Sequence, residues 1–441
     1  MNRFFYSVLI RALSPALLVW MALRARKAGG HWEACGAARF GHYAGAAPAP
    51  GAIWIHAVSL GETRAAQPFV RAVLDRGHRV LLTHLTATGR AEGARAFSED
   101  IAQGRLIQEW LPYDFPGATR RFIARHRPLA GVLIEREVWP NLIHAASRAG
   151  VPMILASARM SNASLRQSLR MGRIMREAYG RFQGVYAQSL LDARRLERAG
   201  AVAVRVSGNF KFDLRLDRER VARGGDFAAR LGRKTVAIAS TREGEDALFI
   251  QAMRHQIERV RQHGIEPGDE ALFYLIPRHP ARFDEAAEIL RQAGLPFVRR
   301  SELIQLGDGG TSAIQACQGI SVVLGDTLGE MAWYYAACQV AIVGGSFVPL
   351  GGQNFIEASA LGKPVLVGPH TANFEQAVAD ALKAGAIECA ADADQAVQRA
   401  LQWLEDPRCL ARMGEAGSHW VRQHTGAVDR VVNGLEDMLR V

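Results

Sequence analysis

The stretch of sequence that decides the fold runs from Gly344 to Phe374 and reads GGSFVPLGGQNFIEASALGKPVLVGPHTANF. The apolar run Val340–Val343 comes directly before it and predicts a buried strand. The first glycine pair would end that strand, because glycine lets the backbone turn sharply or a ligand approach closely. A second glycine pair leads to Asn354, where the pattern predicts the start of a helix. Glu357 follows at the spacing of a capping box.

This order of strand, glycine loop and helix is typical of a nucleotide site. The helix is expected to end near Gly362, and residues 364–367 predict the next buried strand. A helix N-terminus behind a glycine loop offers N–H groups to a phosphate, and ligands of parallel sheets bind at the carboxyl ends of strands. Glycine pairs also serve simply as turns, so the motif alone leaves a purely structural role open.

Length and composition narrow the class of protein. The 441 residues predict two domains of roughly 200 residues each. A net charge of +11 suits a partner that carries negative charge, such as nucleic acid, an anionic membrane or a phosphorylated substrate, although codon bias toward arginine explains it as well. The five cysteines are scattered without a C-x-x-C pair, which indicates a reducing compartment and no zinc site.

The N-terminus predicts a membrane anchor over residues 1–27. Residues 4–23 are mostly apolar, and their number is close to the roughly 20 residues that span a bilayer. Arg11 and Pro15 interrupt the run, so the helix could instead lie in the plane of the membrane or simply cover the first domain. The basic residues of 24–27 would keep the body of the protein in the cytoplasm.

Apolar runs that alternate with helical patterns predict two parallel sheets with helices on both faces. In the first half these runs cover residues 53–58, 80–85, 106 onward, 131–134, 153–156, 185–188 and 204–207. In the second half they cover residues 236–240, 272–276, 296–299, 321–324, 340–343 and 365–367. We therefore expect Rossmann-like domains at 28–208 and 209–415 that face a cleft, and a C-terminal helix at 416–441 that could pack back on the first domain.

Glu62 is the first residue with a plausible chemical role. It lies in the turn after the first strand, three residues beyond Ser59, which is again the spacing of a capping box. Apart from capping, a carboxylate there could act as a general base, because a helix dipole would keep it ionised near neutral pH.

Further charged residues follow other strands of the first half and the junction. Glu135 and Glu137 come directly after the strand that ends at Ile134. They could hold a proton, a hydroxyl or an amino group, or form a solvated surface pair. Lys211, in the crossover to the second half, could neutralise a leaving phosphate or remain a solvated linker residue.

The second half offers candidates for a nucleotide site. Arg278 ends an apolar strand and could bind a phosphate or a base carbonyl. The segment Gly325–Glu330 is another turn from strand to helix. This division suggests an acceptor in one domain and a nucleotide in the other. The sequence contains no Walker loop, no G-x-G-x-x-G after a strand and no H-E-x-x-H.

Six segments in this order resemble the 3-deoxy-D-manno-octulosonic acid (Kdo) transferases of lipid A biosynthesis. They are Ile53–Glu62, Glu135–Asn141, Gly208–Asp213, Pro277–Pro280, Gly325–Glu330 and Gly344–Phe374. The resemblance covers nearly the whole chain, including the N-terminal anchor.

The resemblance implies a fold and a reaction. The fold would be the GT-B glycosyltransferase type. The donor would be CMP-Kdo, and the acceptor the tetraacylated lipid A precursor lipid IVA. Kdo would be transferred with inversion, without a metal ion or another cofactor, in the lipopolysaccharide pathway of Gram-negative bacteria. The protein would work on the anionic cytoplasmic side of the inner membrane, with no nucleic acid as partner.

The resemblance also implies roles for particular residues. Glu62 would be the general base, and Glu135 and Lys211 would stabilise the transition state. The donor would contact Pro277, Arg278, Leu328, Gly329, Glu330, Asn354, Phe355, Ile356 and Glu357. Gln353 departs from the family pattern, which commonly has a histidine there, so any role of that imidazole is lost.

Two other classes of protein remain open at this point. One is a different enzyme of GT-B type, such as a nucleotide-sugar epimerase or another sugar transferase, which a failure to bind CMP would favour. The other is a non-enzymatic basic protein that binds membrane or nucleic acid, which predicts no loss of activity on substitution of Glu62. No recognised nucleic-acid-binding motif supports that last class.

Overall fold

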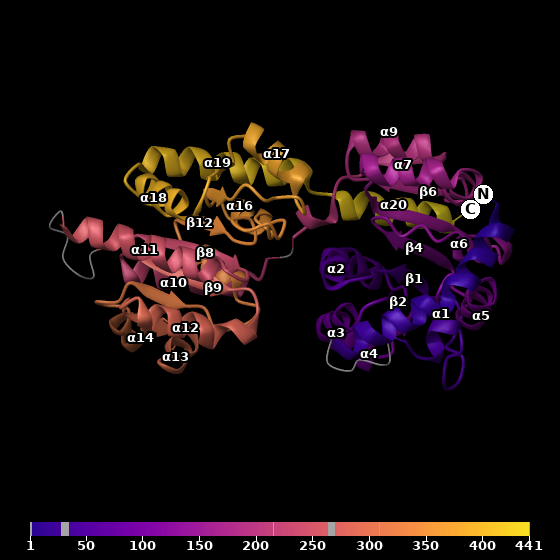
Figure 1. The fold of residues 1–441 in the computed structure, drawn as a ribbon, viewed down its shortest axis with the longest axis horizontal. Coiled ribbons are helices and arrows are strands. Elements are labelled where there is room, and N and C mark those ends of the chain that lie inside the picture. The colour runs from indigo at the N-terminus through magenta and orange to yellow at the C-terminus, as the bar shows by residue number, and fades with distance from the viewer. Residues whose placement is uncertain (1, 28–34, 215, 263–269, 308, 441) are drawn as a thin grey trace. The chain divides into compact units, whose positions relative to one another are not determined.

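The computed structural model of the chain describes residues 2–27, 35–214, 216–262, 270–307 and 309–440. Contacts divide the chain into two compact units (Figure 1). Unit 1 comprises Met1–Leu214 and His424–Val441, and unit 2 comprises Arg215–Gln423. The contacts thus divide the chain after Leu214 and after Gln423, whereas the sequence analysis placed these boundaries after residues 208 and 415.

Unit 1 is built on a parallel sheet of seven strands in the order β3-β2-β1-β4-β5-β6-β7. The strands are β1 (Ile53–His56), β2 (Val80–His84), β3 (Leu106–Trp110), β4 (Ala130–Ile134), β5 (Met153–Ala158), β6 (Gly184–Ala187) and β7 (Val204–Val206). The predicted runs of the first half are therefore confirmed as strands. The order of strands reverses between β1 and β4, which in such sheets is where ligands bind.

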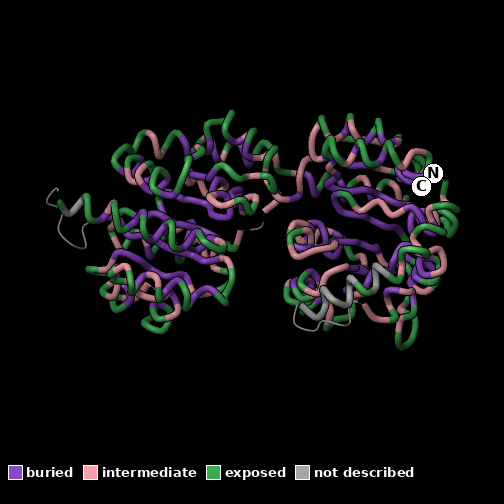
Figure 2. Tube along the Cα trace, in the orientation of Figure 1, coloured by how far each residue is buried: buried purple, intermediate pink, exposed green. Residues whose placement is uncertain are grey.

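Helices cover both faces of this sheet. They are α2 (Leu60–Asp75), α3 (Ala87–Ala96), α4 (Ser98–Ala102), α5 (Pro116–His126), α6 (Pro140–Arg148), α7 (Asn162–Met171), α8 (Arg173–Tyr179), α9 (Leu190–Ala199) and α20 (Ala427–Leu439), with short 3-10 turns at η2 (Ala37–Phe40) and η3 (Phe210–Phe212). Because alternate residues of a strand face opposite sides, Ile53 and Ile55 join one apolar cluster and Trp54 joins another. Figure 2 shows the central strands as buried and the outer helix faces as exposed.

The C-terminal helix α20 belongs to the core of unit 1. Val431, Val432 and Leu435 are buried in the same cluster as Phe69 of α2. The start of α20 is held by Asp213, whose carboxylate accepts hydrogen bonds from the backbone N–H of Gly426 and, at 2.7 Å, from that of Val428. The last residues of the chain are therefore structural parts of the N-terminal unit.

Unit 2 has a second parallel sheet of seven strands, in the order β10-β11-β9-β8-β12-β13-β14. The strands are β8 (Thr235–Thr241), β9 (Leu272–Pro277), β10 (Phe297–Arg299), β11 (Val322–Leu324), β12 (Val340–Val343), β13 (Val365–Val367) and β14 (Ile387–Cys389). Its order reverses between β8 and β12.

The remaining elements surround this second sheet. They are α10 (Arg218–Leu231), α11 (Glu245–Gln262), η4 (Pro280–Arg282), α12 (Phe283–Gln292), α13 (Arg300–Gln305), α14 (Thr311–Ala316), α15 (Met331–Ala337), α16 (Ile356–Ala360), α17 (Glu375–Lys383), α18 (Ala393–Leu404) and α19 (Pro407–His424). Both halves predicted from the alternation of apolar runs are thus Rossmann-like sheets with covering helices.

The first helix, α1 (Arg3–Lys27), begins and ends close to the predicted bounds of the apolar N-terminal segment. One side packs on the rest of unit 1, because the Tyr6 hydroxyl donates to Asp114 at 3.0 Å and the Ser7 hydroxyl donates to Asn141 at 3.2 Å. Large apolar side chains elsewhere on the helix are exposed, namely Phe4, Phe5, Val8, Leu9, Leu13 and Val19. Among the described residues, no helix combines the length and apolarity needed to cross a membrane.

Candidate active site

The carboxyl edge of the sheet in unit 1 brings the predicted residues of the first half together. Glu62 follows β1, Glu135 follows β4, and these two strands are neighbours at the reversal of strand order. Lys211 lies in η3, beyond β7. Burial lowers the pKa of Lys211, while the nearby carboxylates of Glu135 and Glu62 act in the opposite direction. The three residues therefore share one electrostatic environment.

Glu62 is held in the first turn of α2 in a way that differs from a capping box. Its Oε2 accepts a hydrogen bond of 2.9 Å from the backbone N–H of Val58, and the Ser59 hydroxyl donates to its Oε1 at 3.3 Å. Ser59 is the N-cap residue, but its side chain makes no capping hydrogen bond. The predicted capping box is therefore wrong, because the carboxylate fastens the loop before the helix instead.

The expectation that the helix dipole keeps Glu62 ionised is also wrong. The pKa of Glu62 is raised to about 7, mainly by burial and also by the charges of Glu137 and Glu135, against the hydrogen bonds from Val58 and Ser59. Desolvation and like charge thus outweigh the helix terminus. A carboxylate with such a pKa is well suited to accept a proton near neutral pH.

Glu135 occupies a strained and buried position at the end of β4. Its backbone has φ of 59°, in the left-handed region that residues with a Cβ seldom adopt, and the residue is only 6% exposed. Its Oε2 accepts a hydrogen bond of 2.7 Å from Nε of Arg159, which directly follows β5. The carboxylate is thus fixed between two strand ends.

Glu137, the alternative to Glu135, lies in the same turn but has different partners. Its Oε2 accepts a hydrogen bond of 2.9 Å from Nε1 of Trp139. Burial raises the pKa of Glu137, and the Glu135 carboxylate acts in the same direction. The pair is therefore a group of coupled, partly buried carboxylates, which excludes the solvated surface pair considered from the sequence.

The loop that carries Lys211 is fixed by a chain of side-chain hydrogen bonds. The Asn209 side chain accepts from the backbone N–H of Lys211 at 3.0 Å and donates to Gln188 at 3.1 Å. Gln188 in turn donates to the backbone carbonyl of Ser157 at 2.9 Å. Phe210 stacks on Phe69 of α2, at 5.2 Å between ring centroids, so the helix that carries Glu62 also supports Lys211. Lys211 is therefore no solvated linker residue.

Three residues of this site were missed by sequence reasoning: Arg159, Gln188 and Ser157. A usable signal exists for Arg159, because a charged residue directly after a predicted buried strand lies at the same sheet edge as Glu135. Ser157 has φ of 47° at an irregularity in the pairing of β5 with β6, which nothing in the local sequence announces.

The predicted donor residues all lie in unit 2. Pro277 ends β9 and is buried, and Arg278 follows it at the sheet edge. Arg278 and Glu357 both act on the buried Tyr335 hydroxyl, since burial and Glu357 raise the pKa of Tyr335 while Arg278 lowers it. A cation and a carboxylate thus both act on one buried hydroxyl of unit 2.

The helix expected to start at Asn354 starts later and is short. Helix α16 covers only Ile356–Ala360, its N-cap residue is Phe355, and that side chain makes no capping bond. Asn354 accepts from the backbone N–H of Ile356 at 3.1 Å and donates to Glu357 at 3.0 Å. The predicted capping box is thus replaced by a bond between two side chains, and five residues give only a weak helix dipole.

The segment Leu328–Glu330 divides into an exposed and an anchored part. Leu328 is 67% exposed, and Gly329 has φ of 82°, which glycine tolerates best. Glu330 accepts hydrogen bonds from the Thr327 hydroxyl and, at 3.0 Å, from the fully buried Arg300. The Glu330 carboxylate is therefore largely committed to holding this turn.

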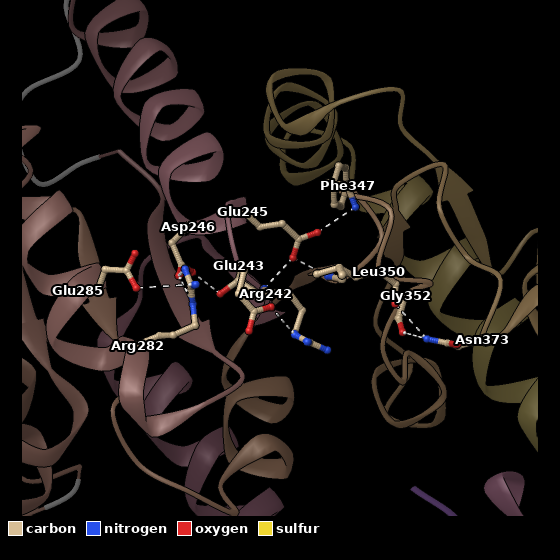
Figure 3. A network of polar contacts seen from close by, with 12 residues as sticks. Arg242, Glu243, Glu245, Asp246, Arg282, Glu285, Phe347, Leu350, Gly352 and Asn373 are labelled. Carbon is tan, nitrogen blue, oxygen red and sulfur yellow. Dashed lines mark hydrogen bonds and ion pairs between the residues drawn. The ribbon is translucent and has the colours of Figure 1, made fainter. Parts of the chain in front are cut away.

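The glycine loop after β12 does not offer all its N–H groups to a ligand. The N–H of Gly345 donates to Glu245 at 2.6 Å, and that of Phe347 donates to the same carboxylate at 2.9 Å (Figure 3). The prediction that this loop presents its N–H groups to a phosphate is therefore wrong for these two.

As for metals, the described residues contain no group of three or more His, Cys, Asp or Glu side chains that could hold an ion.

Comparisons with known proteins show which family the chain resembles. The family described as 3-Deoxy-D-manno-octulosonic-acid transferase (kdotransferase) matches residues 36–214. A 3-deoxy-D-manno-octulosonic acid transferase of Bordetella pertussis is 53% identical over 441 residues, which is 100% of both chains. One of Haemophilus influenzae is 30% identical over 449 residues and covers 100% of this chain and 99% of its own.

Among solved structures, a glycosyltransferase from Rickettsia africae covers 89% of this chain and 99% of its own, with a TM-score of 0.55. The two sequences are only 11% identical, so this likeness shows the fold alone. Together with the two parallel sheets, it confirms the predicted α/β fold with two Rossmann-like domains of the glycosyltransferase type.

Proposed function

This chain belongs to the family of Kdo transferases, and on that premise we propose that it moves Kdo from CMP-Kdo to lipid IVA, with inversion and without a metal ion. The convergence of Glu62, Glu135 and Lys211 at one sheet edge of unit 1 carries this proposal. These residue types are what a glycosyl transfer needs: a base for the attacking hydroxyl and charges that stabilise the transition state.

Glu62 acts as the general base in this proposal. It takes the proton from an acceptor hydroxyl, and that oxygen attacks the anomeric carbon of Kdo on the side opposite to the departing CMP. A single displacement of this kind inverts the configuration at the anomeric carbon. The pKa of Glu62, raised to about 7 by burial, supports this role because proton transfer is most effective when the pKa lies near the working pH.

Lys211 and Glu135 provide fixed charges beside the reacting atoms. Lys211 is a cation that can compensate negative charge as the phosphate leaves, and its loop is fixed by Asn209 and Gln188, so little reorganisation is needed. Glu135 is oriented by Arg159 and can orient the acceptor or balance positive charge at the sugar. With these groups in place, the reaction needs no metal ion.

Unit 2 binds the donor in this proposal. Arg278 pairs with the single phosphate of CMP, and Glu357 accepts hydrogen bonds from the ribose hydroxyls. Pro277, Leu328–Glu330 and Asn354–Ile356 surround the nucleotide. This assignment is supported by the fact that Arg278 and Glu357 both act on the pKa of the buried Tyr335 hydroxyl.

The acceptor is a lipid, and the protein is proposed to work at the cytoplasmic face of the inner membrane. The exposed apolar side chains of α1 and the net charge of +11 suit an anionic bilayer surface. We expect sedimentation with vesicles that contain phosphatidylglycerol, and a loss of most of this binding in Phe4→Ser/Phe5→Ser/Leu9→Ser. Equal sedimentation of both proteins would remove α1 from this role.

The reaction itself is tested with CMP-Kdo and lipid IVA in the presence of EDTA, with product mass as the readout. Wild type should add one or more Kdo units, whereas Glu62→Ala should add none at an equal enzyme concentration. Glu99→Ala, an exposed glutamate on α4, is the matched control and should retain full activity. Activity of Glu62→Ala at the wild-type rate would refute the base, and a wild type that neither transfers Kdo nor binds CMP would refute the function.

A further inference from the structure

A buried carboxylate fills an anion-binding position in unit 2. Glu245, the first residue of α11, has no exposed surface. Its two oxygens accept three backbone N–H bonds, from Arg242 at 2.8 Å, from Gly345 at 2.6 Å and from Phe347 at 2.9 Å. Figure 3 shows the Glu245 side chain directed toward the backbone nitrogen of Phe347 on the glycine loop.

The position of this carboxylate is the one that phosphates favour in sheets of this kind. It lies where the strand order reverses between β8 and β12, at the carboxyl ends of both strands. Folds of this architecture bind the pyrophosphate of a dinucleotide at that point, on backbone N–H groups next to a helix N-terminus. Here the corresponding backbone N–H groups already donate to the carboxylate of Glu245.

The glycine loop is shaped around Glu245. A Cβ at Gly344 would lie 2.8 Å from Oε2 of Glu245 and 2.8 Å from Cα of Thr241, so only glycine fits. Gly345 has φ of 69°. The backbone thus approaches the carboxylate as closely as such loops approach a phosphate.

Neighbouring contacts hold Glu245 in this position. The next residue, Asp246, is also fully buried and accepts hydrogen bonds from the Thr241 hydroxyl and from Arg282, whose Nε lies at 3.1 Å. The start of α11 is therefore fixed to the end of β8. Glu245 cannot make room for a ligand without breaking three hydrogen bonds inside the protein.

We propose that Glu245 is a specificity-determining residue that restricts the donor site to nucleoside monophosphate sugars. Its carboxylate occupies the position where a nucleoside diphosphate would place its second phosphate, and like charges in one desolvated place strongly disfavour binding. This inference rests on the proposed function, in which the donor is a CMP-sugar. The protein would then discriminate against nucleoside diphosphates because the Glu245 carboxylate repels the second phosphate, in addition to making favourable contacts with the monophosphate.

The test compares the affinities of the full chain for CMP and CDP by isothermal titration calorimetry. Wild type should gain no affinity from the second phosphate. Glu245→Ala frees the three N–H groups, so the ratio of CDP affinity to CMP affinity should rise at least tenfold. The matched control is Glu243→Ala, which removes a neighbouring, exposed carboxylate that pairs with Arg242 and should leave the ratio at the wild-type value.

Each outcome decides the matter. A ratio in folded Glu245→Ala within twofold of wild type overturns the inference while the proposed function stands, provided that CMP still binds. If Glu245→Ala does not fold, as judged by circular dichroism, the wild type decides: tighter binding of CDP than of CMP overturns the inference, and equal or weaker binding supports it. A wild type that binds neither nucleotide removes the proposed donor, and the inference falls with it.

Discussion

At the scale of single residues, the most informative group is Glu62. Its hydrogen bonds to Val58 and Ser59 favour the charged form, yet burial and two neighbouring glutamates bring its pKa to about 7. The same desolvation that makes the carboxylate a good base makes its charged form unfavourable in the folded protein.

This pKa predicts the pH dependence of the reaction. Because the base acts only when ionised, kcat/KM should fall with an apparent pKa near 7 as the pH is lowered, by about 100-fold at pH 5. The measurement is transfer of Kdo from pH 5 to pH 8 in buffers of constant ionic strength. A rate that stays level down to pH 5 would show that Glu62 titrates normally or is not the base.

The same shift predicts a gain of stability on neutralising Glu62. A carboxyl group whose pKa is raised in the folded state favours folding below its unfolded pKa and loses that contribution as pH rises through about 7. At pH 8, Glu62→Gln should therefore unfold with a free energy about 1–2 kcal/mol higher than wild type, after allowance for its partial exposure. At pH 4 the difference should vanish.

Denaturant unfolding at both pH values checks this, with Glu99→Gln as the exposed control. A variant that is less stable than wild type at pH 8 would contradict the assignment of burial as the cause of the shift. The inactive variant would thus be the more stable one, as expected where a catalytic group is desolvated.

At this scale, the sequence predicts positions set by local patterns, but it does not predict contacts between residues that are far apart in the chain. Glu135 directly follows a buried strand and Glu62 lies in the first helical turn after one, so their place at the sheet edge was predictable from the pattern. The partner of Glu135 was not predictable, because the bond from Arg159 joins residues that follow two different strands. The capping-box spacing at Ser59 was misleading, since the carboxylate bonded one residue earlier, at Val58.

At the scale of elements, the start of α20 is capped by a side chain that is distant in sequence, Asp213. Asp213 accepts from the N–H groups of Gly426 and Val428, which no preceding turn of α20 can pair. Asp213→Ala should lower the free energy of unfolding of unit 1 by about 1–2 kcal/mol, the usual contribution of a helix cap. Asp429→Ala, an exposed residue of the same first turn, should change it by less than about 0.5 kcal/mol.

Urea unfolding monitored at two wavelengths measures both variants. Equal stability of Asp213→Ala and wild type would show that water replaces the carboxylate at no cost. The strands up to β13 were predicted, most of them from apolar runs, whereas β14 (Ile387–Cys389) and the late start of α16 were missed. Its first residues are used in the bond between Asn354 and Glu357, which delays the helix to Ile356.

At the scale of the whole molecule, one unit is formed by a single segment of the chain and the other by two. Unit 2 is continuous, whereas unit 1 needs residues 424–441 in addition to its first 214. The buried side chains of Val428, Val431, Val432 and Leu435 contribute about 1.5–3 kcal/mol each. Their sum is comparable to the whole stability of a typical domain.

We therefore expect a fragment of residues 215–423 to fold and bind CMP by itself. A fragment of residues 1–214 should not unfold cooperatively, and joining residues 424–441 to it through a flexible glycine-serine linker should restore cooperative unfolding. Circular dichroism melts and calorimetric titration with CMP check all three fragments. Cooperative unfolding of residues 1–214 alone would show that α20 is dispensable.

The return of the C-terminal helix to the first unit also orders events during synthesis. The apolar side chains of α2 that pack against α20 remain uncovered while the ribosome makes the entire second unit, because Val431 and its neighbours follow that unit in the chain. The N-terminal half is thus the last to be completed, although it is the first to be made. A premature stop just before residue 424 would spare unit 2 and remove the helix that completes the unit carrying Glu62.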